Sequence, residues 1–177
     1  HPPRARPGSS GASGGGYKGQ ETEPAAATET MLQEQDGNVV SERSRFSHKA
    51  AGVPGTVAGL ALALEQHGTL SLSQALAPAI RLAREGFVVP HRFTEGLEQA
   101  RDRLERLPAT RATVYKEDGS APQPGELFRQ PELADTLQRI AEQGVKGFYE
   151  GETAQLIVAE MQRGEGLITL EDLRNYE

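Results

Sequence analysis

The sequence predicts a mostly α-helical fold, and three of its features support that prediction. Apolar residues recur at spacings of three and four, the period that places them on one face of a helix. Glycines follow several of these segments, at the position where helices commonly end. Two capping boxes, Ser71-x-x-Gln74 and Thr169-x-x-Asp172, mark helix starts, because their side chains satisfy backbone N–H groups there.

The N-terminal part of the chain contains few of these signals. Residues 1–19 are rich in Gly, Ser and Pro, and we expect a flexible tail or linker. The run Gly14-Gly15-Gly16 has an alternative interpretation as an anion-binding loop, which requires a flanking strand and helix that the sequence does not indicate. Residues 25–33 predict a short helix after Pro24, and residues 41–45 predict an exposed loop.

Helical patterns fill most of the remaining chain. The first follows the loop Gly52-Val53-Pro54-Gly55-Thr56 and ends at Gly68, and the second follows Ser71 and ends at Gly86. Pro78 lies inside the second pattern, so either this helix is kinked or two short helices meet there. The apolar face of the first helix consists of Val57, Leu60, Ala61 and Leu64. That of the second consists of Leu72, Leu76, Ala79, Ile80 and Ala83.

A third helix is expected over residues 91–107, with Pro108 as its end. Residues 109–129 predict a loop with a small hairpin, because they combine a short run of β-favouring residues with a turn signal. Extended segments are expected at residues 87–89 and 113–115, and the turn at Asp118-Gly119.

Three more helices are expected toward the C-terminus. One starts at Pro131 and ends at Gly144, and the next ends at Gly164. The last is capped by Thr169 and runs to the end of the chain. Between the first two, the stretch Gly147-Phe148-Tyr149-Glu150-Gly151 predicts a compact aromatic turn.

Composition excludes several classes of function. The chain has 177 residues, a length that suits about one domain. Its formal net charge is −6. Its isoelectric point of about 5.3 argues against a nucleic-acid partner, since such a partner requires a basic surface. No apolar run approaches the roughly 20 residues that a membrane-spanning helix needs. The absence of Cys excludes disulfides, thiolate metal sites and a Cys nucleophile.

No catalytic or metal-binding pattern stands out among the polar residues. The spacings of His1, His48, His67 and His91 do not match those of metal ligands, so structural or surface roles are favoured, and we expect no metal and no cofactor. No pair of carboxylates stands out as an acid/base couple. The loop at residues 52–56 presents N–H groups to an anion, or is a turn whose glycines adopt backbone angles closed to other residues; the turn is favoured.

Five segments resemble, in the same order, motifs of the γ-glutamyltransferase family, also called γ-glutamyl transpeptidases or glutathione hydrolases. Residues 47–60 are similar to the family's G-V/T-P-G-T-V-A-G segment, and residues 76–87 to P-A-I-x-L-A-x-x-G-F. Five motifs in order are far more specific than any one of them, and the resemblance covers residues 20–177. The other three segments are residues 127–134, 144–151 and 166–173.

The resemblance implies a fold and an activity. Residues 20–177 would be part of the large subunit, the outer helices of an αββα sandwich of the N-terminal-nucleophile hydrolase type. In this family a precursor cleaves itself, and the new N-terminal Thr of the small subunit, activated by its own α-amine, attacks a γ-glutamyl amide. The acyl group then passes to water or to an amino acid, and glutathione is the usual donor. The chain would hold no catalytic residue of its own, its partner would be that small subunit, and its location periplasmic, secreted or membrane-anchored.

One substrate contact is implied within this chain. The family pattern R-E-x-A-P-A-x-A-T aligns with residues 20–28, and Gln20 stands where the family's Arg grips the α-carboxylate of the donor. Gln donates neutral hydrogen bonds but supplies no charge. Two alternatives therefore stay open beside the γ-glutamyl enzyme: an acylase-like relative with another amide specificity, and a non-catalytic, degenerate helical segment.

Overall fold

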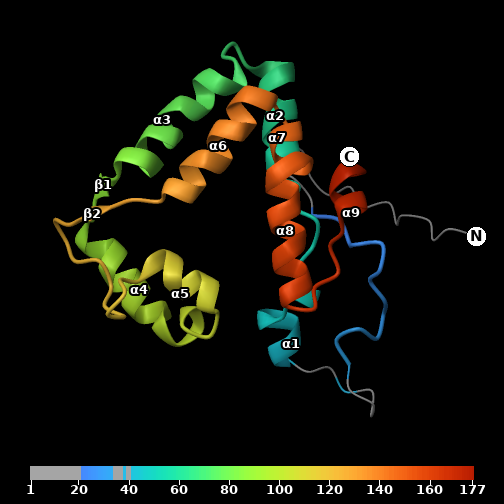
Figure 1. The fold of residues 1–177 in the computed structure, drawn as a ribbon, viewed down its shortest axis with the longest axis horizontal. Coiled ribbons are helices and arrows are strands. Elements are labelled where there is room, and N and C mark those ends of the chain that lie inside the picture. The colour runs from blue at the N-terminus through green and yellow to red at the C-terminus, as the bar shows by residue number, and fades with distance from the viewer. Residues whose placement is uncertain (1–20, 34–37, 39–40) are drawn as a thin grey trace, which may run out of the picture.

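The computed structural model describes residues 21–33, 38 and 41–177. This part of the chain is mostly helical, as predicted, with one short pair of strands (Figure 1). A 3-10 helix, His48–Ala50, lies between α1 and α2. The helices are α1 (Ser41–Phe46), α2 (Thr56–His67), α3 (Leu72–Glu85), α4 (His91–Leu104), α5 (Pro108–Val114), α6 (Pro131–Gln143), α7 (Lys146–Tyr149), α8 (Gly151–Arg163) and α9 (Leu170–Arg174), and the strands are β1 (Phe87–Val88) and β2 (Leu127–Phe128).

α3 begins and ends as its sequence predicts. The Gln74 amide N–H donates to Ser71 Oγ at 3.2 Å, and Ser71 N–H donates to the Gln74 side chain at 2.9 Å, which completes the capping box. The helix continues through Pro78, so the alternative of two short helices is wrong. Gly86 ends it at φ 92°, in the left-handed region, and a Cβ there would lie 2.8 Å from the carbonyl oxygen of Phe128.

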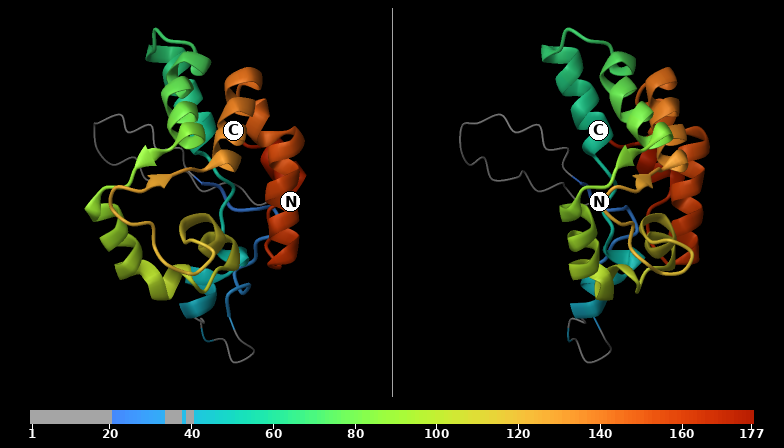
Figure 2. Two further views of the ribbon diagram at one scale, coloured as in Figure 1. Left: turned by 60° about the vertical axis from the view of Figure 1, so that its left-hand side comes forward. Right: turned by 90° about the vertical axis from the view of Figure 1, so that its left-hand side faces the viewer.

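α3 and α6 lie side by side and form one arm of the molecule (Figures 1 and 2). Arg84 on α3 contacts Asp135 on α6 at 3.0 Å, and Gln130 N donates to Ala83 O at 2.8 Å just before α6 begins. α6 starts at Pro131, as predicted, because proline tolerates the first turn, where its missing N–H has no helical partner.

β1 and β2 connect this arm to α4 and α5 (Figure 2). The two strands are antiparallel, with Phe87 opposite Phe128. The rings of Phe87, Phe93 and Phe128 cluster with centroid separations of 5.2 to 5.7 Å. The extended segment expected at residues 87–89 therefore exists over its first two residues. The small hairpin expected within residues 109–129 is wrong, because the strand found there, β2, pairs with β1 at least 39 positions away.

The region after α4 differs from the prediction. α4 ends at Leu104, and Pro108 starts α5 instead of closing the previous helix. Thr113 and Val114, expected to be extended, form the end of α5, because a proline at the first helical position favours a helix over their β propensity. The expected turn at Asp118-Gly119 is confirmed, with Gly119 at φ 81°.

Residues 25–33 do not form the expected helix. The N–H groups of Ala27, Met31 and Gln33 each donate to the carbonyl three residues earlier, which makes separate turns and not a continuous helical ladder. The predictions for residues 1–19 lie outside the described part of the chain.

Residues 41–45, expected to be an exposed loop, belong to α1. Contacts with a distant segment support this short helix: Arg106 pairs with Glu42 at 2.8 Å, and its guanidinium lies 5.2 Å from the centre of the Phe46 ring. The aromatic turn expected around Phe148 is a short helix, α7.

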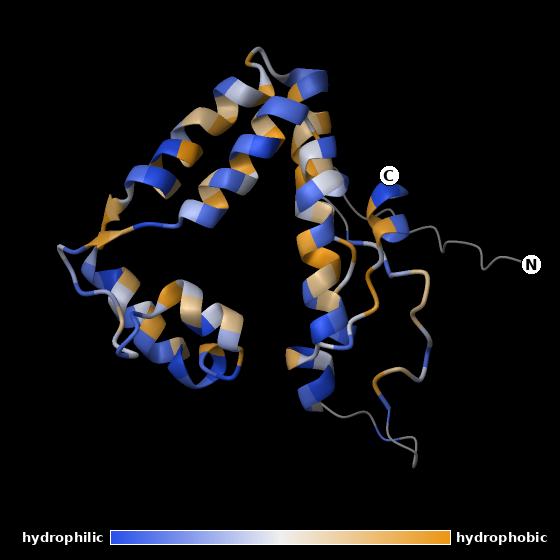
Figure 3. Ribbon diagram, in the orientation of Figure 1, coloured by the Kyte–Doolittle hydropathy of each residue, from blue (hydrophilic) through white to orange (hydrophobic). Residues whose placement is uncertain are grey.

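Two hydrophobic clusters form the core of the part of the chain that the structure describes. The larger joins α7, α8 and α9 to the loop before α2, and the smaller lies between α4 and the segment after α5. Several large apolar side chains remain exposed, among them Val88 on β1, Leu127 on β2 and Leu156 on α8. Figure 3 shows hydrophobic positions on both strands and along α8. None of the helices in the described residues is long and apolar enough to cross a membrane. The buried residues of the larger cluster are Val53, Tyr149, Ala154, Ile168 and Leu173. Those of the smaller cluster are Leu97, Tyr115 and Ala121.

Candidate functional site

The segment at residues 21–28, which directly follows Gln20, packs against the loop before α2. Thr22 and Val53 form an antiparallel bridge in which Val53 N donates to Thr22 O at 2.8 Å. Val53 is only 1% exposed, so this backbone contact lies at the core. Gly52 permits the approach, because a Cβ at this position would lie 3.0 Å from Glu21 Cβ.

Residues 52–55 lead from the bridge at Val53 into α2, and the backbone angles expected for their glycines are not found. Gly55 has φ −101°, and Gly52 is likewise outside the left-handed region, so the expectation that both need angles closed to other residues is wrong. Gly52 is needed for its close contact with Glu21 instead. At the start of α2, the Ala58 N–H already donates to the hydroxyl of Tyr149 at 3.3 Å.

Tyr149 on α7 holds this loop in place. Its hydroxyl donates to Pro54 O at 2.7 Å while it accepts from Ala58 N. Its ring stacks on Tyr176 with centroids 5.4 Å apart and an interplanar angle of 4°. Burial raises the pKa of the Tyr149 phenol above its ordinary value, so the hydroxyl stays protonated and keeps its donor role.

Asp172 joins α9 to the segment at residues 21–28. Its Oδ2 accepts from Thr169 N at 2.8 Å and from Thr169 Oγ1 at 2.7 Å, and Asp172 N donates back to Thr169 Oγ1 at 3.1 Å. Its Oδ1 accepts from Ala25 N at 2.8 Å. Burial by itself would raise the pKa of Asp172, but the hydrogen bonds from Ala25 and Thr169 hold it below its ordinary value.

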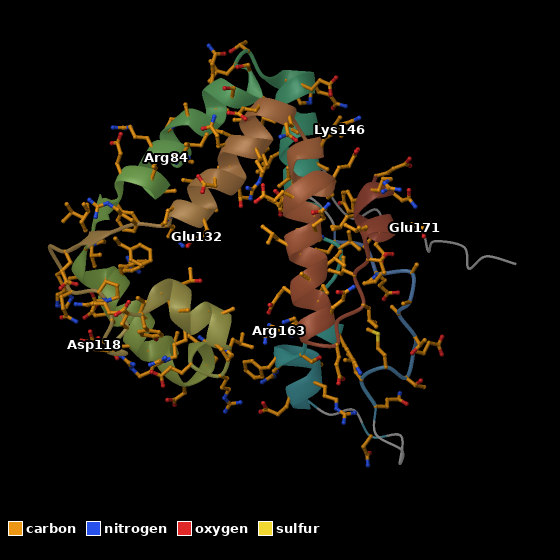
Figure 4. All side chains as sticks on the ribbon, in the orientation of Figure 1. Arg84, Asp118, Glu132, Lys146, Arg163 and Glu171 are labelled. Atoms are coloured by element: carbon orange, nitrogen blue, oxygen red, sulfur yellow. The ribbon has the colours of Figure 1, made fainter. Side chains whose placement is uncertain are left out.

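A charged cluster lies at the C-terminal end of α8, where Figure 4 labels Arg163. Glu160 contacts His48 Nε2 at 2.8 Å and accepts from Arg163 Nε at 2.7 Å. Arg163 first, and then His48, lowers the pKa of Glu160 to about 2, so this carboxylate is ionised. The cluster borders a cavity of about 400 Å³ that Arg45 and Arg106 also line.

The structure locates only some of the other residues that the sequence singles out. Gln20 lies outside the described residues, and so does His1. His67 is the last residue of α2, and His91 at the start of α4 contacts Glu95 at 3.3 Å. Within the part of the chain that the structure describes, no group of three or more His, Asp or Glu is arranged to hold a metal ion.

Sequence reasoning missed the roles of Tyr149 and Asp172 at this site. The capping box predicted Oδ2 of Asp172, but not Oδ1, whose partner is 147 positions away. Likewise, the hydroxyl of Tyr149 reaches a carbonyl 95 positions away. The one signal in the sequence for the contact of Tyr149 was the tyrosine itself, because a tyrosine in a buried turn requires a hydrogen-bond partner for its hydroxyl.

A protein-family model described as Gamma-glutamyltranspeptidase matches residues 12–177. The chain is 40% identical over 158 residues to the glutathione hydrolase proenzyme of Pseudomonas sp. (strain A14), covering 89% of this chain and 28% of that protein. It is 39% identical to the glutathione hydrolase proenzyme of Escherichia coli (strain K12), covering 89% of this chain and 27% of that protein. The chain therefore spans little more than a quarter of the length of these relatives.

Solved structures agree with these matches. The Helicobacter pylori gamma-glutamyltranspeptidase superposes with a TM-score of 0.86 at 42% identity, over 90% of this chain and 46% of that one. A cephalosporin acylase from Bacillus halodurans superposes with a TM-score of 0.68 at 29% identity, over 90% of this chain and 30% of that one. With the family model matching nearly the whole chain, this chain belongs to the γ-glutamyltranspeptidase family.

Proposed function

We propose that this chain is part of the large subunit of a glutathione hydrolase, an enzyme that cleaves γ-glutamyl amides such as glutathione. The observation that supports this most strongly is the 40% identity, over 158 residues, to a glutathione hydrolase proenzyme. A proenzyme is processed before it acts, which agrees with a precursor that divides into a large and a small subunit. The partner of this chain is then the small subunit of the same precursor.

The chemistry follows from an N-terminal Thr on that small subunit. Its α-amine takes the hydroxyl proton as the oxygen attacks the γ-carbonyl carbon of the donor, and the same proton passes to the departing amine as the C–N bond breaks. Water or the amino group of an acceptor then attacks the γ-glutamyl ester and regenerates the Thr. The role of the present chain is to hold the donor, with Gln20 at the position that faces its α-carboxylate.

We place the described helices on the outside of an αββα sandwich whose sheets come from other parts of the enzyme. Residues 20–177 then form one part of that domain, and residues 1–19 a tail or linker. Adjacent exposed apolar side chains support this arrangement, as at Val88 and Leu127, which lie opposite each other on β1 and β2, because contiguous apolar surface marks a contact with another part. The large exposed ones in the described residues are Leu60, Leu62, Leu70, Leu82, Val88, Leu127, Leu133, Val145, Leu156 and Leu170.

The test is the processing and acylation of the full-length precursor. We expect spontaneous cleavage into two subunits, with Thr as the first residue of the smaller one by N-terminal sequencing. Brief exposure to a γ-glutamyl donor should then add the mass of one γ-glutamyl group to that subunit. Replacement of the Thr by Ala is the control and should abolish both events. A precursor that stays in one piece, or that has no such Thr, would refute the proposal.

An acylase-like specificity is the second candidate function. Gln20 supports it, because a neutral side chain at this position binds a carboxylate more weakly than an Arg does. The likeness to the Bacillus halodurans cephalosporin acylase, at 29% identity, points the same way. A panel that compares γ-glutamyl amides with amides of other acids separates the two, since an acylase would prefer the latter.

A further inference from the structure

We propose that α2 is an interaction surface, and that in the full-length protein other parts of the same precursor enclose it on opposite sides. The surface that covers it is apolar and uncharged. This inference rests on the proposed function in one respect only, because it takes residues 1–177 to be part of a longer polypeptide. It goes beyond the arrangement proposed above, in which an outer helix needs to cover only one face.

The sequence of α2 has no polar face. From Thr56 to Leu64 the helix reads TVAGLALAL, which contains no charged residue. A helix that is apolar on all sides is normally buried, whereas a helix at a surface has a polar face opposite its apolar one. The sequence of α2 therefore requires protein on more than one side of it.

The described part of the chain leaves α2 largely uncovered. None of the residues of α2, all of which the structure describes, is buried, and Leu60 and Leu62 are 57% and 48% exposed. Its first turn does reach the core, because Val57 and Ala58 pack against the larger cluster. Leu60 and Leu62 are two positions apart, which is about 200° around a helix, so they lie on opposite sides of α2.

The C-terminal half of α2 also borders a cavity of about 290 Å³. Its apolar lining comes from α2, from the link to α3, from α3 itself and from the N-cap of α7, and a single charged side chain, Glu65, borders it. Contiguous exposed apolar surface of this kind marks a contact with another part of a protein. The main apolar lining residues are Ala61, Leu64, Leu70, Leu72 and Val145.

A second copy of the chain does not fit this surface. A symmetric dimer contact uses the same single patch on each subunit, and a stable one buries about 800 Å² per partner. Leu60 and Leu62 require two separate contacts, on opposite sides of a stretch of helix that is only about 14 Å long. Neither side of so short a stretch supplies the area that a dimer needs.

More of the same polypeptide does fit. The chain spans 28% of the length of the Pseudomonas sp. proenzyme and 46% of the Helicobacter pylori chain on which it superposes. These relatives therefore hold a large amount of polypeptide beyond the part that they share with this chain. Segments of one folded polypeptide can cover two sides of a helix at once, and an apolar surface suits α2 because a charge buried there would have no partner.

The experiment measures how fast single cysteines react in the full-length protein, whether or not it is processed. The present chain has no Cys, so Leu60→Cys and Leu62→Cys each place one reporter on α2. Arg103→Cys, at an exposed position of α4, is the matched control on another helix. Each variant is treated with N-ethylmaleimide, and mass spectrometry of the peptide that carries the new cysteine gives the extent of reaction.

We expect both cysteines on α2 to react at least about a hundredfold more slowly than Arg103→Cys, because a covered thiol reacts only when the structure opens locally. In denaturant all three should react at similar rates. Equal rates in the folded protein, or protection at only one of the two α2 positions, would overturn the proposal. Protection that disappears when the protein is diluted to monomers would overturn it as well, because the cover would then be a second copy.

Hydrogen exchange on the unmodified full-length protein supplies a readout that does not depend on how the variants fold. Peptides that cover residues 59–64 should exchange more slowly than peptides that cover residues 99–104 of α4, and faster exchange in α2 would contradict the proposal. Neither readout involves a donor. A protein that fails to turn over γ-glutamyl donors therefore contradicts the proposed function alone, while an unprotected α2 contradicts this inference alone.

Discussion

The hydroxyl of Tyr149 donates a hydrogen bond to the carbonyl oxygen of Pro54 at 2.7 Å, across 95 positions of sequence. This contact fixes α7 against the loop before α2. The same loop carries Val53, whose N–H holds Thr22. Tyr149 therefore supports one of the two contacts that hold residues 21–28, and Asp172 supplies the other at Ala25.

Tyr149→Phe should destabilise the assembled enzyme by about 1–3 kcal/mol, because Pro54 O and Ala58 N both lose a partner close to the core. The measurement is the melting temperature by calorimetry. Thr113→Val is the control, since its hydroxyl bond to Ala109 O lies on an exposed face of α5, and we expect a change within about 0.5 kcal/mol. Equal effects of the two variants would contradict the role of Tyr149.

Gly147→Ala should be among the most damaging single substitutions. A Cβ at Gly147 would press against the carbonyl oxygen of Arg139 and lie 2.8 Å from Ile140 N, so α6 and α7 would have to separate. Gly96→Ala is the contrasting variant, because a Cβ there meets nothing within 4 Å and alanine is the better helix former by about 1 kcal/mol. We expect chemical denaturation to show a loss for the first and a small gain for the second.

Glu160 should contribute stability that acid removes. Its folded pKa of about 2 lies below its ordinary value of 4.5, so the contribution is present above pH 4.5 and is lost as the pH falls toward 2. The difference in unfolding free energy between the unmodified protein and Glu160→Gln should therefore narrow from pH 6 to pH 3, by denaturant titration at each pH. Glu150→Gln is the control variant, because it removes a carboxylate whose contact with Lys146, at 3.9 Å, is long. A constant difference for Glu160→Gln would refute this account.

Local signals in the sequence predicted the helices well wherever they were complete. Ser71 with Gln74, and Thr169 with Asp172, form the capping boxes that their spacing indicates. The family resemblance, from motifs in order, is likewise confirmed. Each capping box depends on residues within a few positions of one another, which is the range over which propensity and capping act.

The sequence failed where distant contacts decide the structure. α1 is supported by Arg106, which is 64 positions away from Glu42, and no local pattern indicates that pair. The tie from Ala25 to Asp172 has the same character at a greater separation. The sequence predicted Pro108 as the end of a helix, whereas it starts α5. Proline is compatible with both positions, and only the packing of the residues that follow it decides between a helix end and a helix start.

If position 20 faces the donor carboxylate, as we propose, Gln20→Arg should lower KM for γ-glutamyl donors by about five- to tenfold without a matching change in kcat, since a charged bidentate contact would then act in the ground state and the transition state alike. The measurement is the kinetics of the assembled enzyme with γ-glutamyl-p-nitroanilide. Gln66→Arg adds the same charge on an exposed part of α2 and should leave KM unchanged. If Gln20→Arg also leaves KM unchanged, position 20 is not at the donor carboxylate.

The most direct test of the central claim is the donor preference of the assembled enzyme. γ-Glutamyl-p-nitroanilide and butanoyl-p-nitroanilide present the same scissile amide, but only the first carries the α-carboxylate and α-amine. We predict that kcat/KM is at least about a hundredfold higher for the γ-glutamyl compound, because a site built for polar groups rejects an analogue that lacks them. Equal values, or a preference for the butanoyl compound, would contradict the assignment as a glutathione hydrolase.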